Sequence, residues 1–89
     1  MKAVVTVVGK DRVGIIATVC TQLASFNINV LDISQTVMQG YFTMMMVVDV
    51  YASPIPVAEL AQQLEEKGKA IGLSIRLQRE DIFEAMHRV

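Results

Sequence analysis

Gly9-Lys10-Asp11-Arg12-Val13-Gly14 is the stretch that decides the fold. It separates an apolar, β-branched run, residues 3–8, from an amphipathic run, residues 13–26. These two runs predict a strand and a helix, and the polar stretch between them is the turn that joins them. The first N–H groups of a helix have no partner within the helix and carry partial positive charge. The stretch is therefore expected to receive an anion or a carboxylate.

The helix that follows the turn has signals at both ends. Its apolar stripe is expected to contain Ile16, Val19, Leu23 and Phe26, which recur at steps of three and four residues. Asp11 is a suitable N-cap, because its carboxylate can accept hydrogen bonds from backbone N–H groups. Asn27 tolerates positive φ and is expected to end the helix.

The rest of the chain supplies three more strands and two more helices. Residues 29–38 and 41–50 alternate as strands, and Gln39-Gly40 between them is a hairpin signal. Ser53-Pro54-Ile55-Pro56 opens a second helix, residues 73–79 alternate strictly as a fourth strand, and residues 80–89 have helical spacing. The order is β-α-β-β-α-β plus a tail helix. It predicts an α+β, ferredoxin-like fold, with a four-stranded antiparallel sheet and two helices on one face.

Size and composition narrow the class of protein. A chain of 89 residues is expected to form one domain, with a core at residues 1–79 and a tail helix at 80–89. Its hydrophobic fraction of 53% is high for this size, so part of the apolar surface is expected to be buried against a second copy. The net charge of −1 does not favour nucleic acid. The single cysteine, Cys20, fits a reducing compartment, and no run is apolar enough for a membrane helix, so we expect a cytoplasmic protein.

Two stretches carry a resemblance to a known family. Val8-Gly9-Lys10-Asp11-Arg12-Val13-Gly14-Ile15-Ile16, followed by Phe26-Asn27-Ile28-Asn29-Val30, resembles the ACT domain, the regulatory amino-acid-binding module of many metabolic enzymes. The usual pattern has Asp or Asn, then Arg-Pro-Gly before the helix, and a Gly-hydrophobic-Asn-Ile sequence after it. The tail, residues 80–88, looks like that of a functionally uncharacterised group of small stand-alone bacterial ACT proteins.

The resemblance implies a side-by-side homodimer with a ligand at its interface. Asp11 stands where the family often has a residue that reaches the ligand, Asn29 where an Asn reaches it from the partner, and Gly14 at the close-approach glycine. Val13 replaces the usual proline and Asn27 the usual glycine; these departures bear on the stiffness of the site and leave the expected fold unchanged. The expected ligand-binding residues are Gly9, Asp11, Arg12, Val13, Gly14 and Asn29.

Each of these residues also has an ordinary structural explanation. Capping also explains Asp11, and capping the entry to a strand explains Asn29. Exposure in a turn explains Arg12, and close packing of helix and sheet explains Gly14. No catalytic residue, cofactor or metal is expected. Cys20 is interpreted as an inert thiol, His87 as an exposed or interface residue, and the run Met44-Met45-Met46 as part of a strand.

Three functions remain open at this point. A regulatory domain that binds an amino acid is the first. A homo-oligomeric interaction module without a ligand, which docks an unidentified protein on its sheet edge and tail helix, is the second. An acylphosphatase-like enzyme is the third, because that fold cradles a phosphate in the turn after its first strand with an arginine. Asp11 beside Arg12 would repel a phosphate, and no asparagine is evident to orient a water.

Overall fold

The computed structural model describes residues 1–87, with side chains as far as residue 85. In chain order its elements are β1 (Lys2–Lys10), α1 (Ile15–Ser25), β2 (Asn29–Met38), β3 (Tyr41–Asp49), α2 (Val57–Ala70), β4 (Ser74–Arg79) and α3 (Glu80–His87). The predicted order of strands and helices is confirmed. The last two residues of the predicted tail helix lie outside the described residues.

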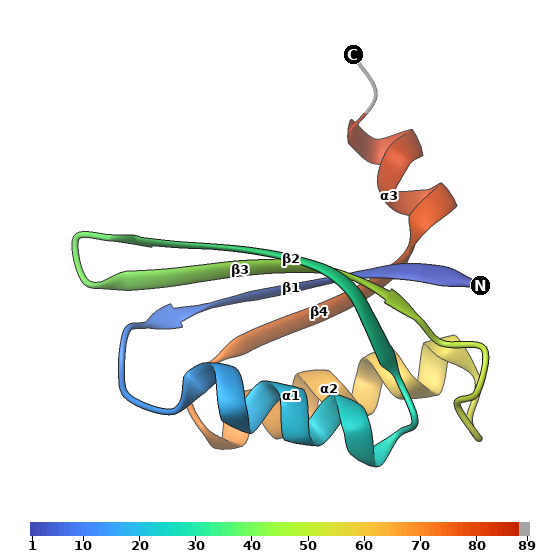
Figure 1. Cartoon of the computed structure of the whole chain (residues 1–89), viewed down its shortest axis with the longest axis horizontal. Coiled ribbons are helices and arrows are strands. Elements are labelled where there is room, and N and C mark those ends of the chain that lie inside the picture. The colour runs from blue at the N-terminus through green and yellow to red at the C-terminus, as the bar shows by residue number, and fades with distance from the viewer. Residues whose placement is uncertain (88–89) are drawn as a thin grey trace.

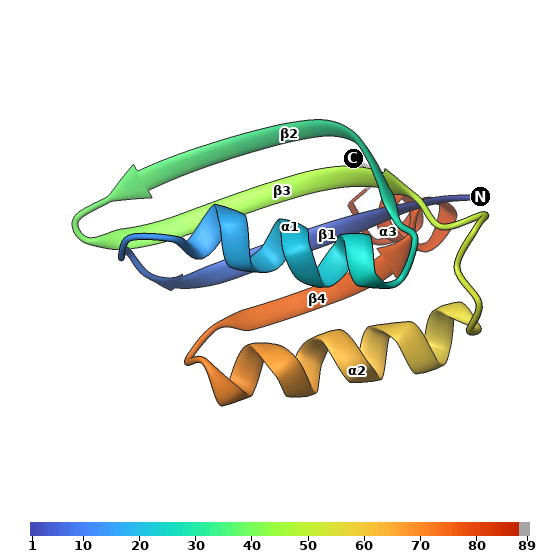
Figure 2. The same ribbon diagram turned by 60° about the horizontal axis from the view of Figure 1, so that its bottom comes forward.

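The four strands form one antiparallel sheet in the order β2-β3-β1-β4. The long strands β1 and β3 occupy its centre, while β2 and β4 are its edges. Figures 1 and 2 show α1 and α2 side by side on one face, with α3 rising from the end of β4 on the other side. The fold is the predicted ferredoxin-like arrangement. None of the described helices is long and apolar enough to cross a membrane.

The hydrophobic core lies between the sheet and these two helices. Strand β3 shows its pattern most clearly, because every second side chain from Phe42 to Val48 is buried. The fully buried large side chains of the core are Leu23, Met44, Met46, Leu60, Leu64 and Ile75, together with Val5, Val7, Val19 and Val48. The core therefore joins α1, α2 and the strands β1, β3 and β4, while β2 contributes the half-buried Val30.

Two turns confirm local predictions. Gln39 and Gly40 have φ values of 50° and 81°, the left-handed pair that a two-residue hairpin between twisted strands needs. Asn27 has a φ of 58° directly after α1, as expected of an Asn that ends a helix. These signals are local, because the backbone conformation of one or two residues decides the turn.

The start of α1 corrects two predictions. Its N-cap is Gly14, with a φ of 88° and no side-chain cap, so the prediction that Asp11 is the N-cap is wrong. The chain needs the residues after Asp11 to reverse direction before the helix begins at Ile15. Because of this later start, the buried stripe begins with Ile15, which is 3% exposed, and Ile16 is turned outward at 37% exposed.

Strand β2 is left largely uncovered. All of its residues are exposed except Val30, which is half-buried. A β-bulge between Val30 and Asp32 shifts its alternation, so Ile33 and Val37 lie on the same face as Met46 and Phe42 of β3. Those β3 side chains are buried, but Ile33 and Val37 remain 45% and 56% exposed. This apolar edge is the kind of surface that the composition led us to expect.

Candidate functional site

The turn 9–14 is held between two other turns of the fold. On one side, the Asp11 N–H donates to the Gly40 carbonyl at 2.8 Å, which ties it to the β2–β3 hairpin. On the other side, an Arg12 guanidinium nitrogen (Nη2) donates to the carbonyl of Ile71, directly after α2. Gly9 packs against Leu73, which enters β4. The turn is thus a fixed part of the fold.

The N-terminus of α1 opens at the end of this turn. The first bond into the helix runs from the Thr18 N–H to the Gly14 carbonyl at 2.9 Å. The N–H groups of residues 15–17 precede it and have no partner available within the helix. Asp11, Arg12, Val13 and Gly14 are all exposed beside them. The arrangement offers a row of N–H donors for a carboxylate and the Asp11 carboxylate for a cation.

The sixth predicted residue lies elsewhere in the same chain. Asn29 pairs with Asp49 at one end of β3, whereas Gly9 and Lys10 of β1 pair with Phe42 and Tyr41 at the other. The eleven residues of α1, a rise of about 16 Å, separate the turn from Asn29. One chain therefore brings Gly9, Asp11, Arg12, Val13 and Gly14 together, but not Asn29.

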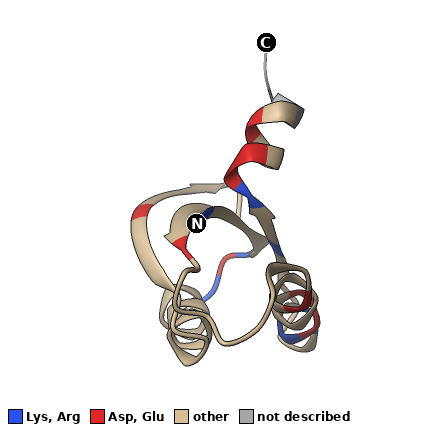
Figure 3. Ribbon diagram, turned by 90° about the vertical axis from the view of Figure 1, so that its right-hand side faces the viewer, with Lys and Arg blue, Asp and Glu red and all other residues tan. Residues whose placement is uncertain are grey.

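The outer surface of α1 has no charged side chain. Its sequence, IIATVCTQLAS, contains no Lys, Arg, Asp or Glu, and Figure 3 shows no charge on this helix, whereas α2 carries both signs. Ile16, Ala17, Thr21 and Ala24 are exposed on it, and Cys20 is half-buried. The outer surface of α1 is thus uncharged, unlike that of α2, and it lies beside the uncovered strand β2.

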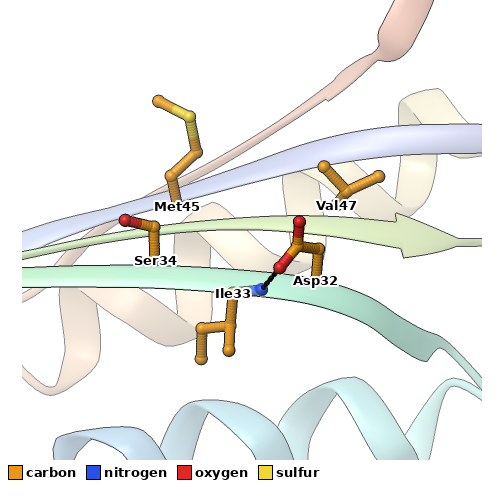
Figure 4. Close-up of a pocket in the computed structure, with 5 residues that line it drawn as sticks. All are labelled: Asp32, Ile33, Ser34, Met45 and Val47. Carbon is orange, nitrogen blue, oxygen red and sulfur yellow. Dashed lines mark hydrogen bonds between the residues drawn. The ribbon is translucent and has the colours of Figure 1, made fainter.

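Two hollows lie away from the turn. One, of about 170 Å³, is lined by Asp32, Ile33, Ser34, Met45 and Val47, on the sheet between β2 and β3. Figure 4 shows Met45, Val47 and Asp32 on the side of the sheet opposite α1 and α2, and Ile33 pointing toward these two helices. The Asp32 carboxylate accepts a hydrogen bond from the Ile33 N–H at 2.9 Å. The other, of about 420 Å³, is lined by Val57, Ala58, Ala61, Leu77, Gln78, Arg79 and Ile82.

Neither hollow is lined by a predicted site residue, and neither was expected from the sequence. Among the side chains that the structure describes, residues 1–85, no group of three or more His, Cys, Asp or Glu is placed to hold a metal. Alternation along β2 and β3 indicates which side chains share a face, but a shallow depression depends on the sizes of neighbouring side chains after packing. No local sequence signal could have found it.

Comparison with known proteins gives the family. The sequence model of the ACT domain family matches residues 2–78. A UPF0237 protein of Clostridium acetobutylicum is 54% identical over the full length of both chains. A solved structure of an ACT domain protein from Streptococcus pneumoniae is 44% identical, covers 98% of each chain and superimposes with a TM-score of 0.83.

More distant likeness is confined to the fold. A formyltetrahydrofolate deformylase from Pseudomonas putida superimposes with a TM-score of 0.77 at 16% identity, and this chain covers 29% of that one. ACT domains are in general regulatory domains that bind small molecules, and they commonly dimerise. The match over residues 2–78 and the full-length relatives show that this chain belongs to the ACT domain family.

Proposed function

We propose that this chain is a non-catalytic regulatory sensor that binds an amino acid at the turn 9–14 within a homodimer. The observation that carries the proposal is an open helix N-terminus that lies beside the uncharged outer surface of α1 and the uncovered strand β2. Family membership supports small-molecule binding and dimerisation in general. We further propose that residues 1–89 form one domain and that the protein is cytoplasmic. The single, half-buried cysteine fits the reducing environment of that compartment.

The free edge of β2 gives the dimer its geometry. A two-fold axis through the middle of β2, perpendicular to the sheet, pairs the two copies of this strand antiparallel and packs α1 against its copy. Asn29 of one chain then lies opposite Met38 of the other. Met38 pairs with Tyr41, and the adjacent Gly40 carbonyl accepts the Asp11 N–H. The dimer thus carries Asn29 to the turn of the partner, which a single chain does not do.

An amino acid fits the chemistry of this composite site. Its α-carboxylate is received by the N–H groups that begin α1, where the helix dipole favours negative charge. Its α-ammonium is accepted by the Asp11 carboxylate in a charge-assisted hydrogen bond. The Asn29 amide, which both donates and accepts, completes the set from the partner chain. Binding regulates only to the extent that the ligand prefers one state of the protein over another.

A second candidate function is an interaction module without a ligand. Met38, Tyr41 and Met45 are exposed on the face of the sheet opposite α1 and α2, and α3 projects from that side. Exposed apolar surface of this kind is typical of association. The acylphosphatase-like alternative has less support, because the Arg12 guanidinium is engaged by a backbone carbonyl and Asp11 lies beside it.

A thermal-shift screen against the twenty amino acids tests the proposed function. A ligand at 100 times its dissociation constant stabilises the protein by about 2.7 kcal/mol, which raises the melting temperature of a chain of this size by several degrees. We expect one amino acid or one chemical class to give this shift, and Asp11→Ala to abolish it. Glu84→Ala, which removes an exposed acidic side chain from α3, is the matched control and keeps the shift. A folded dimer that responds to no amino acid would favour the interaction module instead.

A further inference from the structure

Arg12 connects the candidate site to the far end of α2. Its guanidinium donates to the Ile71 carbonyl, 59 residues away in sequence. No ion pair to an acidic side chain is formed by Arg12 within the part of the chain that the structure describes. A guanidinium has five N–H donors, so one neutral carbonyl leaves most of its capacity unused. Arg12 is thus positioned by the fold and still able to accept a better partner.

The carbonyl that Arg12 engages is one that the helix itself leaves without a partner. Ile71 is the C-cap of α2, and the last carbonyls of a helix have no intrahelical donor. Around it, the N–H groups of Gly72 and Leu73 donate to the carbonyls of Lys69 and Gly68 at 3.2 and 2.8 Å. Arg12 therefore completes the hydrogen bonding of the turn that connects α2 to β4.

A second contact joins the same two turns. Gly9 lies so close to Leu73 that a Cβ atom at Gly9 would be 2.5 Å from the Leu73 Cδ2 atom. From Leu73 the chain runs directly through β4 into α3 without an intervening loop. The turn at residues 70–73 thus contacts the candidate site through Arg12 and Gly9. It also begins the segment that continues through β4 into the projecting helix α3.

We infer that Arg12 is a positioning residue that reports occupancy of the site to α2, β4 and α3. In the empty protein it holds the Ile71 carbonyl; when a carboxylate binds at the N-terminus of α1, the guanidinium turns to it. A carboxylate is the stronger partner, because charge-assisted hydrogen bonds are about twice as strong as neutral ones. Release of Ile71 then loosens the turn at 70–73. This inference rests on the proposed function for its ligand, but its structural half can be tested without one.

Hydrogen exchange on the ligand-free protein tests the structural half. In Arg12→Ala, the amides of Gly72 and Leu73 are expected to exchange about fivefold faster, the factor that one hydrogen bond of about 1 kcal/mol supplies. Arg76→Ala removes an exposed arginine from β4 and is the matched control, with unchanged exchange at these amides. Arg12→Lys keeps a charge and a donor and is expected to recover part of the protection. Unchanged exchange in Arg12→Ala would overturn the inference, whatever the protein binds.

Titration by NMR tests the switch of Arg12 from the Ile71 carbonyl to a bound carboxylate. The probes are glycine as the simplest α-amino acid, acetate as the carboxylate alone and methylammonium as the cation alone. Glycine and acetate are expected to shift the Ile15 and Ile16 amides and, together with them, the Gly72 and Leu73 amides. Methylammonium is expected to leave Gly72 and Leu73 unchanged. Shifts confined to α1 would overturn the switch and leave the proposed function standing. No shift at any amide, either with these probes or with any amino acid of the thermal-shift screen, would contradict both.

Discussion

Gly9 and Leu73 pack so closely that a methyl group added at Gly9 would lie 2.5 Å from the Leu73 Cδ2 atom. Leu73 is buried in the core, so its side chain has little room to move away. We expect Gly9→Ala to lower the free energy of unfolding by about 1–3 kcal/mol, the usual cost of overpacking. Urea denaturation gives this value. In a Leu73→Ala background the clashing atom is gone, and the same substitution should cost less; an equal cost in both backgrounds would contradict the packing explanation.

Gly14 presents the opposite case, in which conformation rather than space limits substitution. Its φ is 88°, and a Cβ atom there would meet nothing within 4 Å. Gly14→Ala is expected to cost about 1–2 kcal/mol, because L-residues other than Gly, Asn and Asp rarely adopt this backbone region. Gly14→Asn should cost less. Thermal or urea denaturation of both variants measures these losses of stability. A Gly14→Ala protein as stable as the wild type would show that α1 can begin in another conformation.

The pH dependence of stability has a defined source at Asp49. Its pKa lies below the ordinary value of 3.8, first because the carboxylate accepts a hydrogen bond from the Tyr51 N–H at 2.9 Å, and then because the N-terminal ammonium lies 3.4 Å away. A pKa lowered by folding stabilises the native state above the unfolded pKa, and this contribution is lost as the pH falls through the folded value.

The corresponding prediction compares wild type with Asp49→Asn, whose amide oxygen can still accept from Tyr51. The free energy of unfolding of the wild type should fall more steeply below about pH 4 than that of the variant. Urea titrations at neutral pH and at acidic pH give both slopes, and the other carboxylates cancel in the difference. Parallel slopes would show that Asp49 has the same pKa in the folded and unfolded chains.

The proposed dimer depends on the uncovered side of β2. Ile33 is 45% exposed there, so Ile33→Lys costs a single chain little but places two charges in the interface. Sedimentation should find a folded monomer. Thr43→Lys is the control, because Thr43 is exposed on the face of the sheet opposite α1 and α2 and lies on β3, the neighbour of the edge strand β2. The Thr43→Lys protein should remain dimeric. A dimeric Ile33→Lys protein would place the interface elsewhere.

The parts of the fold that could be predicted are those that depend on neighbouring residues. Asn27 and Gln39-Gly40 adopt positive φ as their residue types suggest, and the order of strands and helices follows from hydrophobic spacing. The start of α1 was misplaced because Asp11 is a good cap by type, while the N-cap position is held by Gly14. Residue type alone does not say how many residues a strand needs to turn into a helix.

The parts that could not be predicted depend on contacts between distant residues. Arg12 was expected to face a ligand, but its partner is the Ile71 carbonyl, and nothing in either local sequence encodes that pairing. The bulge that places Ile33 over β3 likewise arises from the register of two strands. The separation of Asn29 from the turn of its own chain follows from the length of α1. The expectation that Asn29 reaches the ligand from a partner chain came from the family resemblance and not from the pattern of residues.

A mixing experiment tests the central claim most directly, that each site combines Asp11 of one chain with Asn29 of the other. Calorimetric titration uses the amino acid with the largest thermal shift, on Asp11→Ala, on Asn29→Ala and on the two variants unfolded and refolded together. We predict that neither variant binds alone and that the mixture regains binding, because each mixed dimer contains one intact site. Failure of the mixture to bind, although mixed dimers form, would contradict a site shared between two chains.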